Sequence, residues 1–186
     1  YNKTKNKKNK NPTTKFKTCS NKTEVGKKIK KNKLPLVVKA DGLAAGKGVS
    51  ICKTKKEVLK ISNRIFKGQF KTSKKLVLEE FLEGEEASYF LIVDKKGYNF
   101  FGSAQDHKRV YEKEKGPNTG GMGAYSPAPI ITNELENKIK KKIVNPTLLA
   151  LKNKRNPYTG FLYVGLMIVK QEPYLIEYNV RMGDPE

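Results

Sequence analysis

The stretch that decides the fold is VVKADGLAAGKGVS, residues 37–50. Two β-branched residues lead into Lys39, and a glycine-rich segment follows that contains a second lysine, Lys47. Glycines let backbone N–H groups approach a phosphate where a side chain would obstruct them, so the segment is typical of a phosphate-binding loop. The candidate phosphate-binding residues are Lys39, Gly42, Gly46, Lys47 and Gly48.

The loop matches neither of two common phosphate-binding motifs. A GxxxxGK loop needs Ser or Thr after its lysine, but here only three residues separate Gly42 from Gly46, and Gly48 follows Lys47. A GxGxxG fingerprint opens a helix, whereas this loop lies between two strand-like runs, residues 34–40 and 49–52. We therefore predict a flap between two antiparallel strands that covers a triphosphate. The alternative is a flexible hairpin with a surface lysine.

A second signal lies near the C-terminal end, in the run IEYNVR, residues 176–181. Glu177, Asn179 and Arg181 share one face of a predicted strand, and the apolar residues from Ile176 onward share the other, which we expect to face the core. A carboxylate and an amide oxygen two residues apart suit Mg²⁺, and an arginine can hold an anion. A solvent-exposed strand face is the alternative.

A third signal is the run LVLEEFL, residues 76–82. A strand that ends in two acids followed by Phe-Leu fits a hinge where backbone groups read the edge of an adenine base and an acid reaches the ribose. By itself this pattern is weak, because many strand ends look alike. The candidate hinge residues are Glu79, Glu80, Phe81 and Leu82.

The charge of the chain is strongly positive, with 39 Lys and Arg against 18 Asp and Glu and a formal net charge of +21. Residues 1–33 hold 13 of the lysines and one acid, Glu24, and so carry +12 of this charge. Blocks of like charge are usually solvated surface or a disordered tail. Since no motif of interleaved aromatic and basic residues accompanies them, a nucleic-acid-binding module is the least favoured hypothesis.

The two cysteines, Cys19 and Cys52, form no metal-binding spacing. No run of about 18 apolar residues predicts a membrane span, and no signal peptide is recognisable. We expect a reduced, cytoplasmic protein. The chain begins with Tyr1 and stops at Glu186 without a closing element, so we also expect a fragment cut at both ends.

Hydrophobic periodicity predicts an α+β fold with largely antiparallel strands. A capping box at Thr54 opens a helix, and a second helix is expected over residues 133–153 with a kink at Pro146. The polar, Gly/Pro-rich segment 105–129 is expected to be a long loop, and a loop of that length in a compact domain is usually functional or disordered. Strands are expected over residues 15–18, 34–40, 49–52, 75–81, 87–94, 98–104, 161–169 and 174–180.

Together these signals resemble the ATP-grasp fold, with two α+β subdomains. The motifs KADGLAAGKGV, EEFLEGEEAS, QDHKR (105–109), GPNTGGMGAYSP (116–127), YTGFLYVGLMI and RMGDPE occur in the order found in the phosphoribosylamine–glycine ligase family, also called glycinamide ribonucleotide synthetases. The resemblance covers about residues 11–186. It implies a lead-in over residues 1–33, an ATP-grasp domain over 34–186, and a division of that domain into a flap part, 34–104, and a metal and substrate part, 105–186.

The resemblance implies an ATP-dependent ligase of purine biosynthesis. Glycine would attack ATP to give glycyl phosphate, and the amine of 5-phosphoribosylamine would then displace the phosphate. The implied cofactors are ATP and Mg²⁺ or Mn²⁺, and the partners are these small molecules, with no membrane. Another carboxylate–amine ligase of the same fold is the closest alternative, and the segments 105–109 and 116–127 discriminate against it.

The resemblance also implies roles for individual residues. Lys39 and the glycine loop would hold the ATP phosphates, and the Gly116–Ser126 run would be a lid. Met182 stands where the family usually has Phe, and the strand 161–169 lacks the metal carboxylate found in many proteins of this fold. The remaining implied roles are the ribose for Glu86, Mg²⁺ for Glu177 and Asn179, the acyl phosphate for Arg181, the glycine ammonium for Asp106 and Asp184, and phosphate charge for Lys108 and Arg109.

Overall fold

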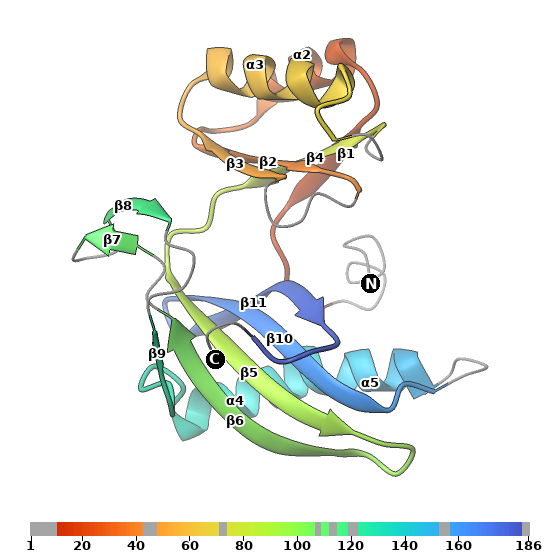
Figure 1. The fold of residues 1–186 in the computed structure, drawn as a ribbon, viewed down its shortest axis with the longest axis vertical. Helices are drawn as coiled ribbons and strands as arrows, with labels where there is room; N and C mark the ends of the chain where they lie inside the picture. Colours follow the sequence, from red (N-terminus) through yellow and green to blue (C-terminus); the bar gives the residue numbers. More distant parts are fainter. Residues whose placement is uncertain are drawn as a thin grey trace. The chain divides into compact units, whose positions relative to one another are not determined.

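The computed structural model describes residues 11–42, 48–70, 74–106, 109–111, 115–118, 123–152 and 157–183, with only the backbone described at 109–110 and 115–118. The chain forms two compact units (Figure 1). The small unit comprises Thr14–Leu82, and the large unit comprises Glu83 onward together with the segment before Thr14.

Among the described residues, the small unit consists of a four-stranded antiparallel sheet and two helices. The strand order is β1-β4-β2-β3, so the chain places β4 between β1 and β2. The expected hairpin around the glycine loop is present, because β2 pairs with β3 in antiparallel register. The elements are β1 (Phe16–Cys19), α2 (Lys22–Lys31), β2 (Leu36–Ala40), β3 (Val49–Cys52), α3 (Lys55–Phe66) and β4 (Leu76–Glu80).

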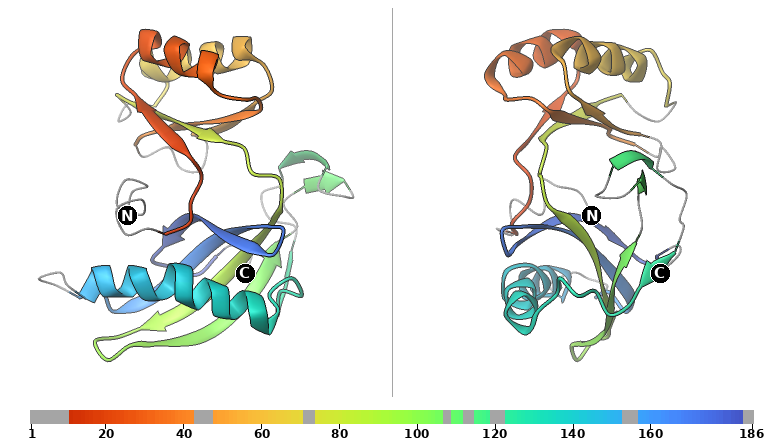
Figure 2. Two further views of the ribbon diagram at one scale, coloured as in Figure 1. Left: turned by 180° about the vertical axis from the view of Figure 1, so that it is seen from behind. Right: turned by 90° about the vertical axis from the view of Figure 1, so that its left-hand side faces the viewer.

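Both helices of the small unit cover the same face of its sheet (Figure 2). Val25 and Ile29 of α2 pack with Val58 and Ile65 of α3 in one core cluster. The expected capping box is confirmed, because the Thr54 hydroxyl accepts from the Glu57 N–H and the Glu57 carboxylate accepts in return. The opposite face of this sheet carries no helix in the described part of the chain, which leaves it for polar groups.

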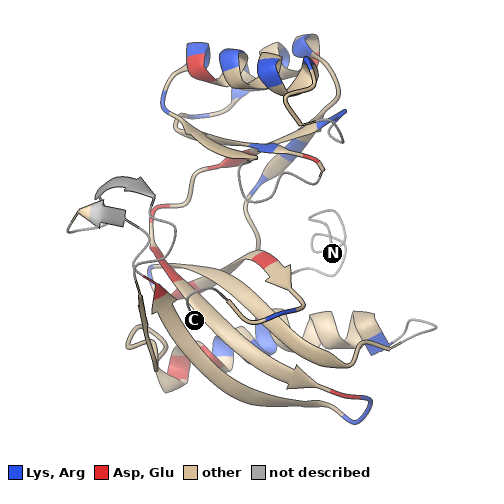
Figure 3. Cartoon of the chain, viewed as in Figure 1, with Lys and Arg blue, Asp and Glu red and all other residues tan. Residues whose placement is uncertain are grey.

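The lysine-rich segment differs from the lead-in that the sequence suggested. Residues 16–19 form β1, and residues 22–31 form α2 with Asn21 as its N-cap. Only Val25 and Ile29, one helical turn apart, are buried, so the apolar stripe is too narrow to stand out among lysines. Figure 3 shows Lys and Arg spaced along α2 and α3, where they form a solvated helix surface.

The large unit is built on a five-stranded antiparallel sheet in the described residues, with the order β11-β10-β5-β6-β9. A separate two-stranded hairpin, β7-β8, follows β6. The strands are β5 (Glu85–Val93), β6 (Tyr98–Asp106), β7 (Arg109–Tyr111), β8 (Lys115–Asn118), β9 (Ala124–Tyr125), β10 (Gly160–Val169) and β11 (Glu172–Asn179), and the helical elements are α4 (Asn133–Ile139), η1 (Lys140–Val144) and α5 (Asn145–Lys152).

One continuous helical rod covers one face of the large sheet (Figure 2). Leu135, Ile139 and Ile143 of the rod pack against alternate residues of β5 and β10. The middle turn, η1, is a π-helix in which the Asn145 N–H donates to the Lys140 carbonyl. The expected irregularity near Pro146 is therefore present, but as a π-helical turn just before the proline, which has no N–H to donate.

A β-bulge interrupts the pairing of β10 with β11. Gly165 pairs with Glu177 while the next residue, Leu166, pairs with Leu175, so Ile176 has no partner on β10. The extra residue shifts the alternation, and Ile176 faces the same cavity as Glu177. The expectation that Ile176 faces the core is therefore wrong, because strand alternation assumes an unbroken ladder.

Two expected boundaries also differ from the structure. The units divide after Leu82 rather than after Ala104, because β5 and β6 pair with each other and with β10 in one sheet. The expected long loop 105–129 contains the short strands β7, β8 and β9, whose two to four residues are too short for a sequence pattern to identify. No helix among the described residues is long and apolar enough to span a membrane.

Candidate active site

The bare face of the small sheet carries a buried ion pair. Lys39 on β2 and Glu79 on β4 lie diagonally across neighbouring strands, and their Nζ and Oε2 atoms are 3.1 Å apart. Glu79 is 2% exposed, and the Thr14 hydroxyl donates to its Oε2 at 3.2 Å. The carboxylate therefore has two partners from two other segments of the small unit.

This pairing gives Glu79 contacts that the sequence did not predict. A carboxylate held by Lys39 and Thr14 inside the sheet orients the lysine, which keeps 23% of its side chain exposed. Lysine has a long flexible stem, so a buried acceptor fixes where its point charge lies. The Glu79 carboxylate is therefore positioned to orient Lys39, and its predicted place at an adenine hinge stays a prediction.

The rest of the predicted nucleotide site is partly described. The Gly48 carbonyl accepts from the Ala40 N–H at 2.9 Å and extends the hairpin past Lys39, and Gly42 is exposed. The Glu80 carboxylate accepts from the N–H of Lys15, the residue just before β1, at 2.8 Å. Phe81 and Leu82 follow in an extended segment with no ladder partner in the described residues. Gly46 and Lys47 lie outside the described residues.

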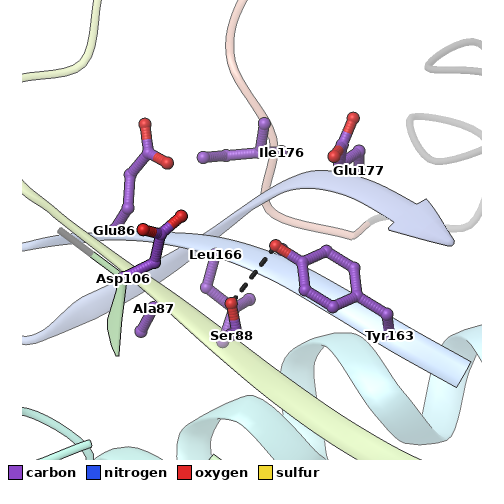
Figure 4. A pocket seen from close by; sticks show the side chains of 9 residues that line it. Glu86, Ala87, Ser88, Asp106, Tyr163, Leu166, Ile176 and Glu177 are labelled. Carbon is purple, nitrogen blue, oxygen red and sulfur yellow. Dashed lines mark hydrogen bonds between the residues drawn. The ribbon is translucent and has the colours of Figure 1, made fainter. Parts of the chain in front are cut away.

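The large sheet has a small polar cavity on the face opposite its helices (Figure 4). Its volume is about 40 Å³, enough for water or a small ammonium or metal ion. Three carboxylates from three different strands line it: Glu86 on β5, Asp106 on β6 and Glu177 on β11. No Lys, Arg or His is among the described residues that line this cavity, so its potential favours a cation.

An aromatic hydroxyl and a glycine shape the floor of this cavity. The Ser88 hydroxyl donates to the Tyr163 hydroxyl at 3.3 Å, and both side chains are buried. A Cβ at Gly165 would come within 3.1 Å of the Tyr163 ring and 3.2 Å of Glu177 Cγ. Glycine at this position therefore lets the ring and the carboxylate approach the same stretch of backbone.

The predicted metal pair lies together at the end of β11. The Asn179 amide donates to Glu177 Oε1 at 3.2 Å, so both side chains occupy one face of the strand. Their carboxylate and amide oxygens are suitable Mg²⁺ ligands, and Mg²⁺ commonly completes its shell with water and phosphate oxygens. Among the described residues no three His, Cys, Asp or Glu side chains gather as a metal cluster. The donor set fits a metal shared with phosphates.

The two residues directly after β11, Val180 and Arg181, are exposed. Arg181 donates from its guanidinium to the Met182 carbonyl at 2.6 Å, which leaves its other N–H donors for an anion. Met182 packs against the small cluster of Phe90, Ala104 and Tyr163, so it fills an apolar position as expected. Of the other predicted substrate-binding residues, only the backbone of Arg109 is described, in β7, and Lys108 and Asp184 lie outside the described residues.

The sequence was compared with models of known protein families. The model of the phosphoribosylglycinamide synthetase ATP-grasp (A) domain matches residues 1–186, which is the whole sequence. The chain belongs to this family. The predicted ATP-grasp fold and the predicted family are therefore confirmed.

Three relatives of this ATP-grasp domain define the extent of the match. The chain is 49% identical over 161 residues to the phosphoribosylamine–glycine ligase of Vibrio parahaemolyticus, covering 85% of the chain and 38% of that protein. It is 47% identical over 179 residues to the chloroplastic phosphoribosylamine–glycine ligase of Arabidopsis thaliana, covering 94% of the chain and 34% of that protein. The crystal structure of the Thermotoga maritima phosphoribosylamine–glycine ligase matches with a TM-score of 0.85 and 37% identity. The match covers 97% of the chain and 46% of the Thermotoga chain. The chain thus spans less than half the length of each.

Within this ATP-grasp domain, the structure groups some of the predicted residues and adds others. Glu86, Asp106 and Glu177 share one cavity, and Lys39 and Glu79 share an ion pair. Sequence reasoning missed the residues that support them. A glycine inside an apolar strand was a usable signal for Gly165, whereas no local pattern distinguishes the others, which are Thr14, Ser88, Tyr163 and Ile176.

Proposed function

We propose that the chain is the ATP-binding part of a phosphoribosylamine–glycine ligase. The observation that carries this proposal is the match of all 186 residues to the synthetase ATP-grasp family. The reaction joins glycine to 5-phosphoribosylamine, with ATP converted to ADP and phosphate. Since the chain spans 38% of its Vibrio relative, the complete active site would include segments beyond those described.

In this proposal the small unit holds the nucleotide. Lys39, oriented by Glu79, places its ammonium on the ATP phosphates, and the glycine loop contributes backbone N–H groups. The backbone from Glu80 to Leu82 has no ladder partner at Phe81 and Leu82 in the described residues, so it is free to read the edge of the adenine base. Glu86, at the start of β5 in the large unit, remains the proposed ligand of the ribose.

The large unit would hold the metal and glycine. Glu177 and Asn179 would hold Mg²⁺ or Mn²⁺, which when bound neutralises phosphate charge during transfer. The carboxylate of Asp106 in the acidic cavity suits the ammonium group of glycine, and Asp184 is the second proposed ligand for it. Lys108 and Arg109 would contribute positive charge near the phosphates.

The proposed chemistry needs positioning rather than a protein nucleophile. The glycine carboxylate oxygen attacks the γ-phosphorus and ADP leaves, which gives glycyl phosphate. The sugar amine then attacks the acyl carbon, phosphate leaves, and the amine proton is lost as the amide forms. Arg181, with exposed guanidinium donors, would stabilise the negative charge of the acyl phosphate, and the 116–126 run would exclude water.

Product formation tests this proposal directly. With ATP and Mg²⁺, we expect the chain, joined to the segments of its Vibrio relative that it does not cover, to release ADP only when both glycine and 5-phosphoribosylamine are present. Lys39→Ala should abolish it, because the ammonium group that positions the ATP phosphates is then absent. ADP release supported equally by an unrelated amino acid and amine would instead indicate another ligase of this fold.

A further inference from the structure

The bulge in β11 is held on both sides by a polar clamp that none of the proposed ligand roles uses. We propose that this clamp, formed by the segment Asn11–Thr13 and by Thr147 and Tyr178, positions Glu177 and Asn179 for the metal. The inference rests on the proposed metal role of these two residues. It concerns groups on the helix side of the sheet, away from the acidic cavity.

The bulge determines where Glu177 points. Because Ile176 is the extra residue, Glu177 pairs with Gly165 and faces the cavity, as Figure 4 shows. A ladder without the bulge would shift β11 by one residue, and a shift of one residue turns every side chain to the opposite face of a sheet. Glu177 would then point toward the helices. The bulge must therefore be held in place for the metal face to exist.

The segment before the small unit holds the residue that precedes the bulge. The Leu175 N–H donates to the Pro12 carbonyl at 2.8 Å, and the Thr13 hydroxyl donates to the Leu175 carbonyl at 2.9 Å. Thr13 also forms a parallel bridge with Leu175. The backbone of Leu175 is thus bound on the free edge of β11 just where the β10 ladder shifts.

A partly buried hydroxyl pair holds Tyr178, the second residue after the bulge. The Tyr178 hydroxyl lies 2.5 Å from Thr147 Oγ1 on α5, and the Asn11 amide donates to the same Thr147 oxygen at 2.8 Å. Asn11 is 4% exposed and Thr147 is 1% exposed. Buried polar groups of this kind are costly to separate. Tyr178 lies between Glu177 and Asn179, so fixing its ring fixes both neighbours.

The π-helical turn explains why a threonine is available there. The i to i−5 bond of η1 inserts one residue into the helical repeat and rotates α5 relative to α4. Thr147 is buried against the sheet after this rotation, whereas the next residues, Leu148 and Leu149, are more exposed. Irregular turns in both the helix and the strand therefore meet at one hydroxyl pair.

The test measures metal affinity rather than turnover. Binding of Mn²⁺ to the full chain with ATP, followed by electron paramagnetic resonance, should weaken about tenfold in Tyr178→Phe, a typical cost of losing an outer partner of a metal ligand. Thr147→Val should weaken it similarly, and Thr147→Ser, which keeps the hydroxyl, should restore it. Tyr174→Phe removes a hydroxyl that has no hydrogen bond within the described residues, from the cavity side of the same strand, and should leave affinity unchanged.

The outcomes separate this inference from the proposed function. Equal Mn²⁺ affinity in the unaltered chain, Tyr178→Phe and Thr147→Val would overturn the positioning role while leaving the metal site in place. No Mn²⁺ binding by the unaltered chain with ATP would overturn the metal role itself, and the inference with it. Circular dichroism and urea unfolding of each variant show whether a loss of affinity comes from loss of the fold, and the Thr147→Ser rescue must hold for the inference to stand.

Discussion

The two sheets of the molecule use their bare faces in opposite ways. Each sheet has helices on one face, and its polar groups lie on the other. On the small sheet a carboxylate faces a lysine, and the pair is internally neutralised. On the large sheet three carboxylates share a cavity with no Lys, Arg or His among its described lining residues. The comparison shows that the neighbour across the strands, and not the residue type, decides whether an acid orients a cation or attracts one.

The largest expected difference between the sheets is in stability. Glu79→Ala removes the buried partner of Lys39, and we expect it to lower the free energy of unfolding by about 3 kcal/mol. Glu177→Ala removes an exposed charge from an acidic cluster and should change it by less than about 0.5 kcal/mol. Urea unfolding measures both. Equal losses in Glu79→Ala and Glu177→Ala would contradict the difference between the two sheets. Recovery of the free energy of unfolding in the double variant Lys39→Met with Glu79→Leu would show that the cost comes from leaving Lys39 unpaired.

The floor of the acidic cavity should be the next most sensitive point. Gly165→Ala brings a Cβ within 3.2 Å of Glu177 and closer still to Tyr163, and we expect it to cost about 2 kcal/mol through overpacking. Gly102→Ala is a matched control, because Gly102 lies in β6 and a Cβ there meets nothing within 4 Å. If both variants unfold at the same urea concentration, close approach at Gly165 is not what requires glycine.

Nucleotide affinity tests the small sheet separately. Glu79→Gln keeps the shape of the side chain but weakens its hold on Lys39, so we expect ATP to bind about tenfold more weakly, with or without Mg²⁺. Thr14→Val should give a smaller loss of the same kind, because it removes the hydroxyl that donates to Glu79 and leaves Lys39 in place. Calorimetry with ATP checks both. Unchanged affinity in Glu79→Gln would show that Lys39 needs no orientation.

The smallest expected effect is on stability in alkali. Burial raises the pKa of Tyr89 in the large unit most, and the negative charge of the nearby Glu136 raises it further. The Tyr89 hydroxyl therefore loses its proton at lower pH in the unfolded chain than in the folded chain. The free energy of unfolding is unaffected by this group below about pH 10 and falls above it by up to about 1.4 kcal/mol per pH unit. Tyr89→Phe should flatten this decline relative to Tyr174→Phe in urea unfolding from pH 9 to 11. Parallel curves for the two variants would contradict it.

The sequence predicted the fold well where a single periodicity runs through an element. The β2-loop-β3 hairpin, the capped helix α3 and the long strands β5 and β10 follow from alternation and capping signals that depend only on neighbours in the chain. Glu177 and Asn179 were placed on one face for the same reason, and their hydrogen bond agrees with it. Local patterns sufficed because the physics that decides these features is local.

The rest could not be read because it depends on distant partners. The contacts of Glu79 with Thr14 and Lys39 could not be read because these residues come from other segments of the small unit. Ile176 was expected in the core because strand alternation places it there. The bulge that turns it away depends on pairing with β10 and on contacts of residues 11–13, which the sequence does not show. Helix α2 was hidden because lysines surround its two buried positions. For Glu79 and Ile176 the deciding contact is far away in sequence, whereas for α2 the apolar pattern is too sparse to read.

The central claim is that the small sheet holds nucleotide through Lys39 and that the large sheet adds a metal through Glu177. Calorimetric titration of ATP into Glu177→Ala, with and without Mg²⁺, tests it most directly. We predict that Mg²⁺ strengthens ATP binding to the unaltered chain and no longer does so in Glu177→Ala, while affinity without metal stays the same. An equal Mg²⁺ enhancement in both proteins, or loss of metal-free binding in Glu177→Ala, would contradict the account.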